Sequence, residues 1–529
     1  MTTRNVASKH QPAVVTRPVE VPLPTAKPAE TIPVSARPPR FTIRDADLFF
    51  AGIGGCGMSG LARMFTARGA RVTGSDSAES PVTGALRADG FTVLAESAVQ
   101  SLPDPCDALI ASAAIRRDHP LMLDAGTRGI PVFSYAEALG ELMARSTGVA
   151  IAGTHGKSTT TAMLGAALVD AGLDPNVIVG ATCPQLAGGS LGSPVFAGPT
   201  GFRTGSHAVP AGPYAGREGL LLAEACEYNR SFHNLAPVVG SISSVEADHL
   251  DVYGSLDQVV EAFRGFAARL PSEKQGGYLL IAHDGAHRRE ITAGLTCAVE
   301  TIGFSPEADW HVSFDPAEQR VTLSHHHDLV ARWGMRMPGA HNAMNAATAC
   351  ALGVVLGGNP ETLGRSLAAF RGLERRCQFL AERQVTGGGV RVYDDYGHHP
   401  SEIDATLRAL RELERPEERE GRLVCVFQPH QHSRTRFLLE EFAAAFTQAD
   451  VVIVPHIYFV RDSEAEKQRV TAADLVDRLR SRGVRAMHLY PFGAIVEQLE
   501  NVCRPGDLLV VMGAGPVWQV ARGYLEAGT

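Results

Sequence analysis

From residue 41 onward, short apolar runs alternate with longer stretches that have the apolar spacing of helices. Examples are DLFFAG near residue 47, GVAIAGT near residue 148 and RLVCVFQ near residue 422. Strands that alternate with helices along a chain build βαβ units around a parallel sheet. The sequence therefore predicts an α/β fold, and its 529 residues leave room for roughly three or four domains of about 150 residues each.

Two breaks, at 145–148 and 371–374, divide this alternation. A third stretch, 187–216, is rich in Gly, Pro and Ser, and we expect it to be a long irregular loop that projects from a domain surface. The segment before residue 41 is rich in Pro, Ala, Thr and Val and poor in aromatic residues. The predicted parts are a disordered tail (1–40), a first domain (41–147), a central domain (148–370) and a third domain (371–529).

Composition restricts the ligands and the compartment. The net charge is 49 − 57 = −8, which argues against a general nucleic-acid binder. No apolar run reaches the ~18 residues of a membrane span, so we expect no stable membrane insertion. The nine cysteines lack paired spacing, which favours free thiols in a reducing, cytoplasmic setting over a disulfide framework. Both a monomer and a dimer stay open.

The first glycine-rich turn follows the run DLFFA and has the sequence Gly52-Ile-Gly54-Gly55-Cys-Gly57. A strand that enters G-x-G-x-x-G and continues into a helix is typical of dinucleotide-binding loops, where bare backbone approaches a pyrophosphate. Asp76 ends the next strand, where such folds hold a ribose. The pattern predicts a phosphate or nucleotide ligand and leaves an NAD-dependent oxidoreductase open. A purely structural turn is the simpler alternative.

The second glycine-rich turn, Gly153-Thr-His-Gly156-Lys157-Ser158, also lies between an apolar run and a helix-like stretch. Backbone N–H groups at a helix start suit a polyphosphate, while Lys157 can reach its β and γ oxygens and the Ser158 hydroxyl can bind Mg²⁺. The loop is shorter than the G-x-x-x-x-G-K-[ST] consensus, because Ile151 stands where the first glycine would. We predict that this turn binds a nucleoside triphosphate.

Acidic side chains follow two further apolar runs. Glu224 and Glu227 lie in LLLAEACE, and Asp248 and His249 lie in EADHLD. Carboxylate oxygens with one imidazole suit Mg²⁺ or Mn²⁺. Taken alone, these residues would be ordinary solvated acids, but a phosphate loop needs a metal partner. We therefore predict a metal site.

Three polar motifs remain. The asparagines of HNAMN (341–345) are best explained, on their own, as a helix cap and close packing. The acids and histidines of YDDYGHHP (393–400) are hard to assign to packing, although a polar surface loop is the alternative. FQPHQHSRTR (427–436) places basic groups at the end of a strand, where α/β sheets bind anions, and Arg434 could hold a carboxylate.

In their order along the chain, these motifs resemble the Mur ligase family, the ATP-dependent amino-acid ligases of peptidoglycan precursor synthesis. The resemblance covers about 41–529 and rests on GIGGCGMSGLA, GTHGKSTTT, EACEYNRSF, EADHLDVY, HNAMNA, DDYGHHPSE and FQPHQHSRTR. It implies an N-terminal Rossmann-like domain for a UDP-linked substrate and a central P-loop ATPase domain with a mostly parallel sheet. It also implies a Rossmann-like C-terminal domain that closes over ATP and the amino acid.

The resemblance implies a reaction as well. Within the family the motifs are nearest to members that join L-alanine to the carboxylate of UDP-N-acetylmuramate. That carboxylate attacks the γ-phosphate of ATP, and the alanine amine then displaces phosphate from the acyl phosphate. ATP and Mg²⁺, or Mn²⁺, are the implied cofactors. A recycling ligase that adds a tripeptide would share nearly every motif and is the alternative, whereas an oxidoreductase or a non-catalytic regulator would leave GTHGKS and the acids without a role.

The same resemblance assigns a role to each motif residue. We expect the catalytic residues to be Lys157, His249, Arg376 and His398, and the metal ligands to be Ser158, Glu224 and His249. The expected ATP contacts are Gly153, Thr154, His155, Gly156, Lys157, Ser158, Thr159, Asn345, Arg375 and Asp395. The expected substrate contacts are Gly52, Gly54, Gly55, Gly57, Met58, Ser59 and Asp76, with Tyr396, His430 and Arg434 as the alanine pocket.

Two sites depart from the family pattern. Gln431 stands where many relatives carry Arg in PHRxxRT, which leaves part of the amino-acid contact open. Cys226 and Tyr228 replace the commoner Asp and Ser of EADES, but Glu224 and Glu227 are present. We therefore expect the metal site to persist.

Overall fold

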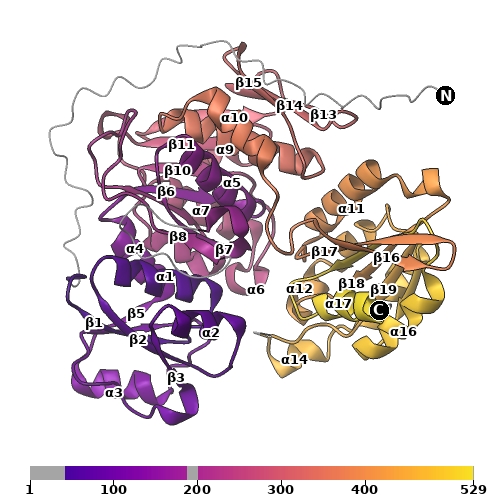
Figure 1. Cartoon of the computed structure of the whole chain (residues 1–529), viewed down its shortest axis with the longest axis horizontal. Coiled ribbons are helices and arrows are strands. Elements are labelled where there is room, and N and C mark those ends of the chain that lie inside the picture. The colour runs from indigo at the N-terminus through magenta and orange to yellow at the C-terminus, as the bar shows by residue number, and fades with distance from the viewer. Residues whose placement is uncertain (1–41, 188–199, 461, 528–529) are drawn as a thin grey trace, which may run out of the picture.

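Three β-sheets organise the chain, one in each of three successive parts (Figure 1). The computed structural model describes residues 42–187, 200–460 and 462–527. We use the names N-terminal, central and C-terminal domain for the parts built around the sheets β1–β5, β6–β15 and β16–β21. The C-terminal domain, orange to yellow in Figure 1, forms a lobe beside the other two. The predicted α/β class is confirmed.

The N-terminal sheet is parallel throughout and has the strand order β3-β2-β1-β4-β5. Two of its helices begin with a capping box, at Ser80 and Ser134, which fixes their first turns. The strands are β1 (Asp47–Ala51), β2 (Arg71–Asp76), β3 (Thr92–Ala95), β4 (Ala108–Ala111) and β5 (Val132–Ser134), and the helices are α1 (Cys56–Ala67), α2 (Pro81–Ala88), α3 (Pro120–Arg128) and α4 (Tyr135–Met143).

The central sheet has the order β15-β14-β13-β12-β11-β10-β6-β9-β7-β8, and it is parallel except for the β7–β8, β13–β14 and β14–β15 pairs. Its strands are β6 (Thr147–Ala152), β7 (Asn176–Cys183), β8 (Thr200–Arg203), β9 (Leu220–Glu224), β10 (Val239–Ile242), β11 (Tyr278–Ala282), β12 (Ala298–Gly303), β13 (Trp310–Asp315), β14 (Arg320–His325) and β15 (Asp328–Gly334). Its helices are α5 (Lys157–Asp170), α6 (Leu250–Tyr253), α7 (Leu256–Ala267), α8 (Arg288–Thr292), α9 (Ala340–Val355) and α10 (Pro360–Ala369). Helices α5 and α9 pack together and are buried along most of their length.

The C-terminal sheet has the order β16-β17-β21-β18-β19-β20, with only β16 antiparallel to its neighbour among the described pairs. Its strands are β16 (Gln378–Val385), β17 (Gly388–Asp395), β18 (Leu423–Phe427), β19 (Val451–Val454), β20 (Arg485–His488) and β21 (Leu508–Met512). Its helices are α11 (Pro400–Glu414), α12 (His432–Phe437), α13 (Leu439–Ala444), α14 (Glu464–Lys467), α15 (Ala472–Ser481), α16 (Phe492–Val502) and α17 (Trp518–Glu526).

The Gly/Pro-rich stretch 187–216 corrects one expectation. Its second half does not project from the surface: β8 pairs with β7 in the central sheet, and the Tyr214 side chain is buried with its hydroxyl donating to the carbonyl of Gly276 at 2.8 Å. A short edge strand and one buried aromatic ring are enough to tie such a segment down. Residues 188–199, and the predicted tail 1–40, lie outside the described residues.

A single apolar cluster extends from the N-terminal domain into the central domain. It contains Leu48 and Phe50 of β1 together with Ile178 of β7, Phe202 of β8 and Phe263 of α7. The C-terminal domain instead has two apolar clusters of its own, one built around α11, α13 and α15 and the other around α16 and α17. Among the described helices, none has both the length and the apolar character needed to cross a bilayer.

Candidate functional site

The second glycine-rich turn connects β6 to the start of α5. Gly156 precedes the helix with φ +81°, and a Cβ built there would lie 2.4 Å from Oδ1 of Asn345. Only glycine fits this position, because an L side chain would be strained and would also overlap α9. The Thr154 N–H donates to the Ser244 carbonyl at 2.9 Å, which ties the turn to the segment after β10. The turn is therefore held open at the N-terminus of a buried helix, where an anion binds well.

Lys157, the first residue of α5, points back into the turn. Its Nζ donates to the carbonyls of Gly153 and Thr154 at 2.6 and 2.9 Å and lies 2.9 Å from Oε2 of Glu227. Burial disfavours the ammonium and is the largest single effect, but the neighbouring acidic groups, with Glu227 first among them, together outweigh it, so the pKa of Lys157 is raised. Lys157 is therefore a buried cation inside the glycine-rich turn.

Oxygen donors surround this lysine. The Ser158 hydroxyl donates to Oε2 of Glu224 at 2.9 Å, and the N–H of Gly180 donates to the other oxygen of Glu224. Glu227, Asp248 and His249 form a second group, in which one ligand atom from each lies within 4.8 Å of the others. Several carboxylates and one imidazole that lie this close together fit a hard divalent cation such as Mg²⁺ or Mn²⁺.

The C-terminal domain supplies the opposite wall through the segment between β17 and α11. Asp395 accepts the N–H groups of Cys377 and Gly397, each at 2.7 Å, so it shapes this loop, and its burial raises its pKa. His398 is neutral, because burial lowers its pKa to about 3. Arg376 lies 5.0 Å from the centre of the Tyr396 ring, which places a cation beside an aromatic face.

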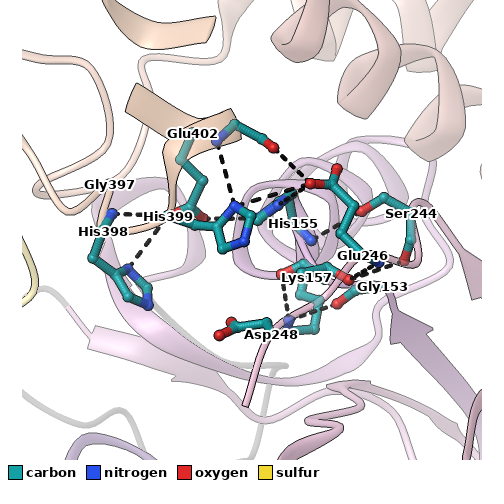
Figure 2. A network of polar contacts seen from close by, with 12 residues as sticks. Gly153, His155, Lys157, Ser244, Glu246, Asp248, Gly397, His398, His399 and Glu402 are labelled. Carbon is teal, nitrogen blue, oxygen red and sulfur yellow. Dashed lines mark hydrogen bonds and ion pairs between the residues drawn. The ribbon is translucent and has the colours of Figure 1, made fainter. Parts of the chain in front are cut away.

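His155 joins the two domains. Figure 2 shows its ring among Glu246, His399 and Glu402. Nδ1 of His155 lies 3.3 Å from Glu402 and Nε2 lies 3.5 Å from Glu246. Burial lowers the pKa of this ring, but the two carboxylates outweigh burial and raise the pKa to about 9. His155 is therefore a second cation of the turn at neutral pH, placed between acids of the central and C-terminal domains.

A second contact between these domains is an ion pair. Nε of Arg434, at the start of α12, donates to Oδ1 of Asp248 at 3.0 Å, and both side chains are buried. Arg434 also lies 3.3 Å from Nδ1 of His430 and 3.5 Å from Nδ1 of His249. The predicted alanine-pocket residues Arg434 and His430 are thus in contact, and Arg434 also touches the predicted metal residue His249.

Two cavities lie between the central and C-terminal domains. One, of about 410 Å³, is lined by residues of both domains, among them Lys157, Glu224, His249, Arg375, Arg376, Tyr396 and His398. The other, of about 280 Å³, is lined among others by Thr159, His341, Asn345, Asp395 and Thr406. They share His155, Gly156, Arg376 and Glu402, so the second glycine-rich turn lies at the boundary between the two cavities.

The first glycine-rich turn lies apart from these cavities, between β1 and α1. Gly52 has φ +76°, and the N–H of Gly54 donates to Oδ2 of Asp76 at 2.8 Å. Asp76 thus holds the turn itself. Met58 belongs to the apolar core, and Ser59 is buried. A Cβ at Gly57 would lie 2.9 Å from the Tyr135 ring, so part of this glycine pattern is required by packing.

From the sequence, Glu246 and Glu402 had no assigned role, and Glu227 and Asp248 were named only beside a metal site, without their partners. Glu246, Asp248 and Glu402 line the cavities or join the two domains, and Glu227 pairs with Lys157. All four lie inside the motifs EACEY, EADHL and HHPSE, so a signal was present. What was missing was the partner of each acid, which comes from another part of the chain.

Comparisons with known proteins identify the fold and the family. Three family models match successive parts of the chain: the catalytic domain of the Mur ligase family over 48–147, the Mur ligase middle domain over 151–353 and the Mur ligase glutamate ligase domain over 375–515. The UDP-N-acetylmuramate–L-alanine ligase of Pelotomaculum thermopropionicum is 37% identical over 481 residues, which cover 89% of this chain and 95% of the relative.

Two solved structures share the fold. The UDP-N-acetylmuramate-alanine ligase of Thermotoga maritima has a TM-score of 0.69 at 24% identity, covering 91% of this chain and 98% of that chain. A murein peptide ligase of Psychrobacter arcticus has a TM-score of 0.65 at 21% identity, with the same two shares. The three matched models, the long alignment with the Pelotomaculum enzyme and the shared fold agree: the chain belongs to the Mur ligase family.

Proposed function

We propose that this chain uses ATP to join L-alanine to the carboxylate of UDP-N-acetylmuramate. The observation that carries the proposal is the cavity between the central and C-terminal domains. There a phosphate turn with two cations meets oxygen donors suited to Mg²⁺ and an arginine suited to a carboxylate. The similarity to UDP-N-acetylmuramate–L-alanine ligases covers about nine-tenths of the chain.

The residues of this chain address the charge problem of the first step. A carboxylate and a triphosphate are both anionic and repel each other, so attack requires fixed positive charge around the γ-phosphate. We assign that charge to Lys157, to protonated His155 and to the N–H groups at the start of α5. Ser158, Glu224, Glu227, Asp248 and His249 would hold Mg²⁺ or Mn²⁺, which supplies further neutralisation of phosphate charge when bound.

In this proposal the nucleotide base and the phosphates lie in different cavities. We assign the adenine to the smaller cavity beside Asn345 and Thr159, on α9 and α5. Arg375 and Arg376 come from the junction with the C-terminal domain and line the larger cavity, where they can contact phosphate oxygens. Asp395 supports this arrangement through its loop, because it accepts two backbone N–H groups.

We assign the amino acid to Arg434, His430 and Tyr396. Arg434 is paired with Asp248, so an incoming amino-acid carboxylate competes with that aspartate for the guanidinium. His398 is neutral at working pH, because burial lowers its pKa to about 3, and it fits a hydrogen-bonding rather than a charged role. Gln431 is buried, with its N–H donating to the Tyr458 carbonyl at 3.1 Å, so its side chain is confined near this pocket.

The first glycine-rich turn completes the proposal. Gly52, Gly54, Gly55 and Gly57 surround the start of α1, where backbone N–H groups suit the diphosphate of a UDP-sugar. Family membership leaves the NAD-dependent alternative without support. We place the reaction in the cytoplasm, with the protein as a monomer or dimer.

Phosphate release tests the proposal. Purified protein is incubated with ATP, Mg²⁺, UDP-N-acetylmuramate and one of L-alanine, glycine, L-serine or the tripeptide of the recycling reaction. Release that is fastest with L-alanine supports the assignment. Release with the tripeptide alone would instead identify the recycling ligase, which the fold similarity to a murein peptide ligase keeps as the second candidate.

A further inference from the structure

Another group of side chains that could bind a metal ion lies at the end of the central sheet formed by β12–β15; β13, β14 and β15 are labelled at the top of Figure 1. Three histidines follow one another here: His325 is the last residue of β14, and His326 and His327 form the turn that leads to β15. His325 faces Glu300 on β12, with Nε2 of the ring 3.3 Å from Oε1 of the carboxylate. This group is built on other strands than β6 and β9, which carry the phosphate turn and Glu224.

The spacing of these groups is close to that of a coordination sphere. One ligand atom from each of Glu300, His325 and His326 lies within 4.8 Å of the other two. Tetrahedral ligands about 2.0–2.1 Å from Zn²⁺ stand roughly 3.4 Å apart, and the contact between His325 and Glu300 already has that length. To reach the same spacing, the His326 ring has to move by about one ångström. It can do so because it lies on an exposed turn, where its side chain is 58% exposed.

The carboxylate is held in place by its neighbours. Oε2 of Glu300 accepts the Tyr278 hydroxyl and Nε1 of Trp310, both at 2.6 Å. The Trp310 ring also stacks on His325, with 4.1 Å between ring centres. Hydrogen bonds and packing of this kind orient metal ligands in many sites. They leave Oε1 of Glu300 directed at the histidines.

We propose that Glu300, His325 and His326 bind a transition-metal ion of the Zn²⁺ type. Two imidazoles and one carboxylate favour such an ion over Mg²⁺, which takes oxygen ligands and water. Asp309 lies next to the group, with Oδ1 3.9 Å from Nδ1 of His326, and is available as a fourth ligand. Binding would replace the direct contact between His325 and Glu300 and would tie the β14–β15 turn to β12.

The competing explanation is that these side chains form a polar network that only anchors the turn. Substitutions of His326 and His327 distinguish this network from a metal site. His326 and His327 both have positive φ, at 46° and 75°, and asparagine tolerates this backbone conformation well. His326→Asn therefore removes one ligand with little effect on the turn. His327→Asn is the matched control, because His327 stands next to it on the same turn but outside the ligand group.

The test is a Zn²⁺ titration of the full chain by calorimetry, with excess Mg²⁺ present throughout. Co²⁺ then serves as a paramagnetic probe, because an ion bound at His325 would lie beside Trp310 and quench its fluorescence. We expect His326→Asn to raise the dissociation constant for Zn²⁺ at least about tenfold and to reduce quenching by Co²⁺. His327→Asn should match the wild-type protein in both measurements.

Two results would overturn the proposal. Equal Zn²⁺ affinity and equal quenching in wild-type and His326→Asn proteins would place any bound ion elsewhere, for instance at the carboxylates beside Lys157. Absence of Zn²⁺ binding at millimolar concentration in the wild-type protein would leave Glu300 and His325 as a polar network only. Neither measurement uses turnover, so each is independent of the proposed ligase reaction.

Discussion

Replacing Glu402 by glutamine tests the charge of the phosphate turn and its tie to the C-terminal domain. Glu402 is one of two carboxylates that hold His155, and it is the one supplied by α11. The variant keeps the size of the side chain but removes its charge. Protonated His155 then keeps only Glu246, which belongs to its own domain.

The magnitude follows from the pKa of His155, which rises from the ordinary 6.5 to about 9. That difference corresponds to about 3 kcal/mol. It changes by a few hundred-fold the equilibrium constant between the state in which His155 contacts both carboxylates and the state in which these contacts are broken. Because the pKa is raised in the native state, the stabilisation is fully present below pH 6.5 and is lost as the pH rises through 9. His399 is neutral throughout this window, since burial lowers its pKa, and it adds no slope.

Hydrogen–deuterium exchange of the peptides that contain His155 and the start of α11 measures this opening. After correction for the intrinsic effect of pH on exchange, protection in the wild-type protein should fall about a hundred-fold between pH 6.5 and pH 9.5. In Glu402→Gln, with half of the pairing removed, the fall should be about tenfold. Glu412→Gln alters an exposed acid of the same helix and should behave like wild type.

Two outcomes would refute this reasoning. Protection that stays flat across the window in the wild-type protein would mean that His155 is not held as a cation. The same pH-dependent fall in Glu402→Gln as in wild type would mean that Glu402 does not contribute to its charge.

Three further predictions follow from the geometry. Gly54→Ala should reduce the free energy of unfolding by about 1–3 kcal/mol and so lower the melting temperature, because its Cβ would lie 2.9 Å from Asp76. Gly84→Ala is the control: its methyl would meet no described atom within 4 Å, so it should stabilise α2 by up to ~1 kcal/mol. Arg434→Met leaves Asp248 buried and unpaired and should cost about 3–5 kcal/mol in urea unfolding, much of it recovered on adding Asp248→Asn. Lys157→Ala should abolish phosphate release while equilibrium dialysis still detects binding of UDP-N-acetylmuramate, and turnover at the wild-type rate would remove this lysine from the mechanism.

Much of the fold could be predicted because buried parallel strands have continuous apolar sequences. The run DLFFA is β1, and the predicted phosphate turn does lie between a strand and a helix, at β6 and α5. Strand β8 could not be found in the same way. Its four residues, TGFR, lie in a Gly/Pro-rich stretch and carry no alternation, and they form a strand because β7 offers a free edge.

The candidate site was predictable residue by residue but not pair by pair. Glycine, lysine and serine in the phosphate turn can be recognised from local spacing alone. The partners of His155 and Asp248 lie 247 and 186 residues away, at Glu402 and Arg434, and no local pattern encodes such a distance. The first pair sets the charge of His155, and the second sets which carboxylate Arg434 binds. Both pairs form only where the central and C-terminal domains pack together.

The apolar cluster shared by the N-terminal and central domains bears on how the protein can be taken apart. Cleavage near residue 147 would divide that cluster and would separate Phe202 of β8 from α1, against which it packs at Gly60. We expect fragments made there to aggregate. The C-terminal domain keeps its two clusters whole and should be obtainable as an independent folding unit. For fragment design, the protein consists of two pieces rather than three.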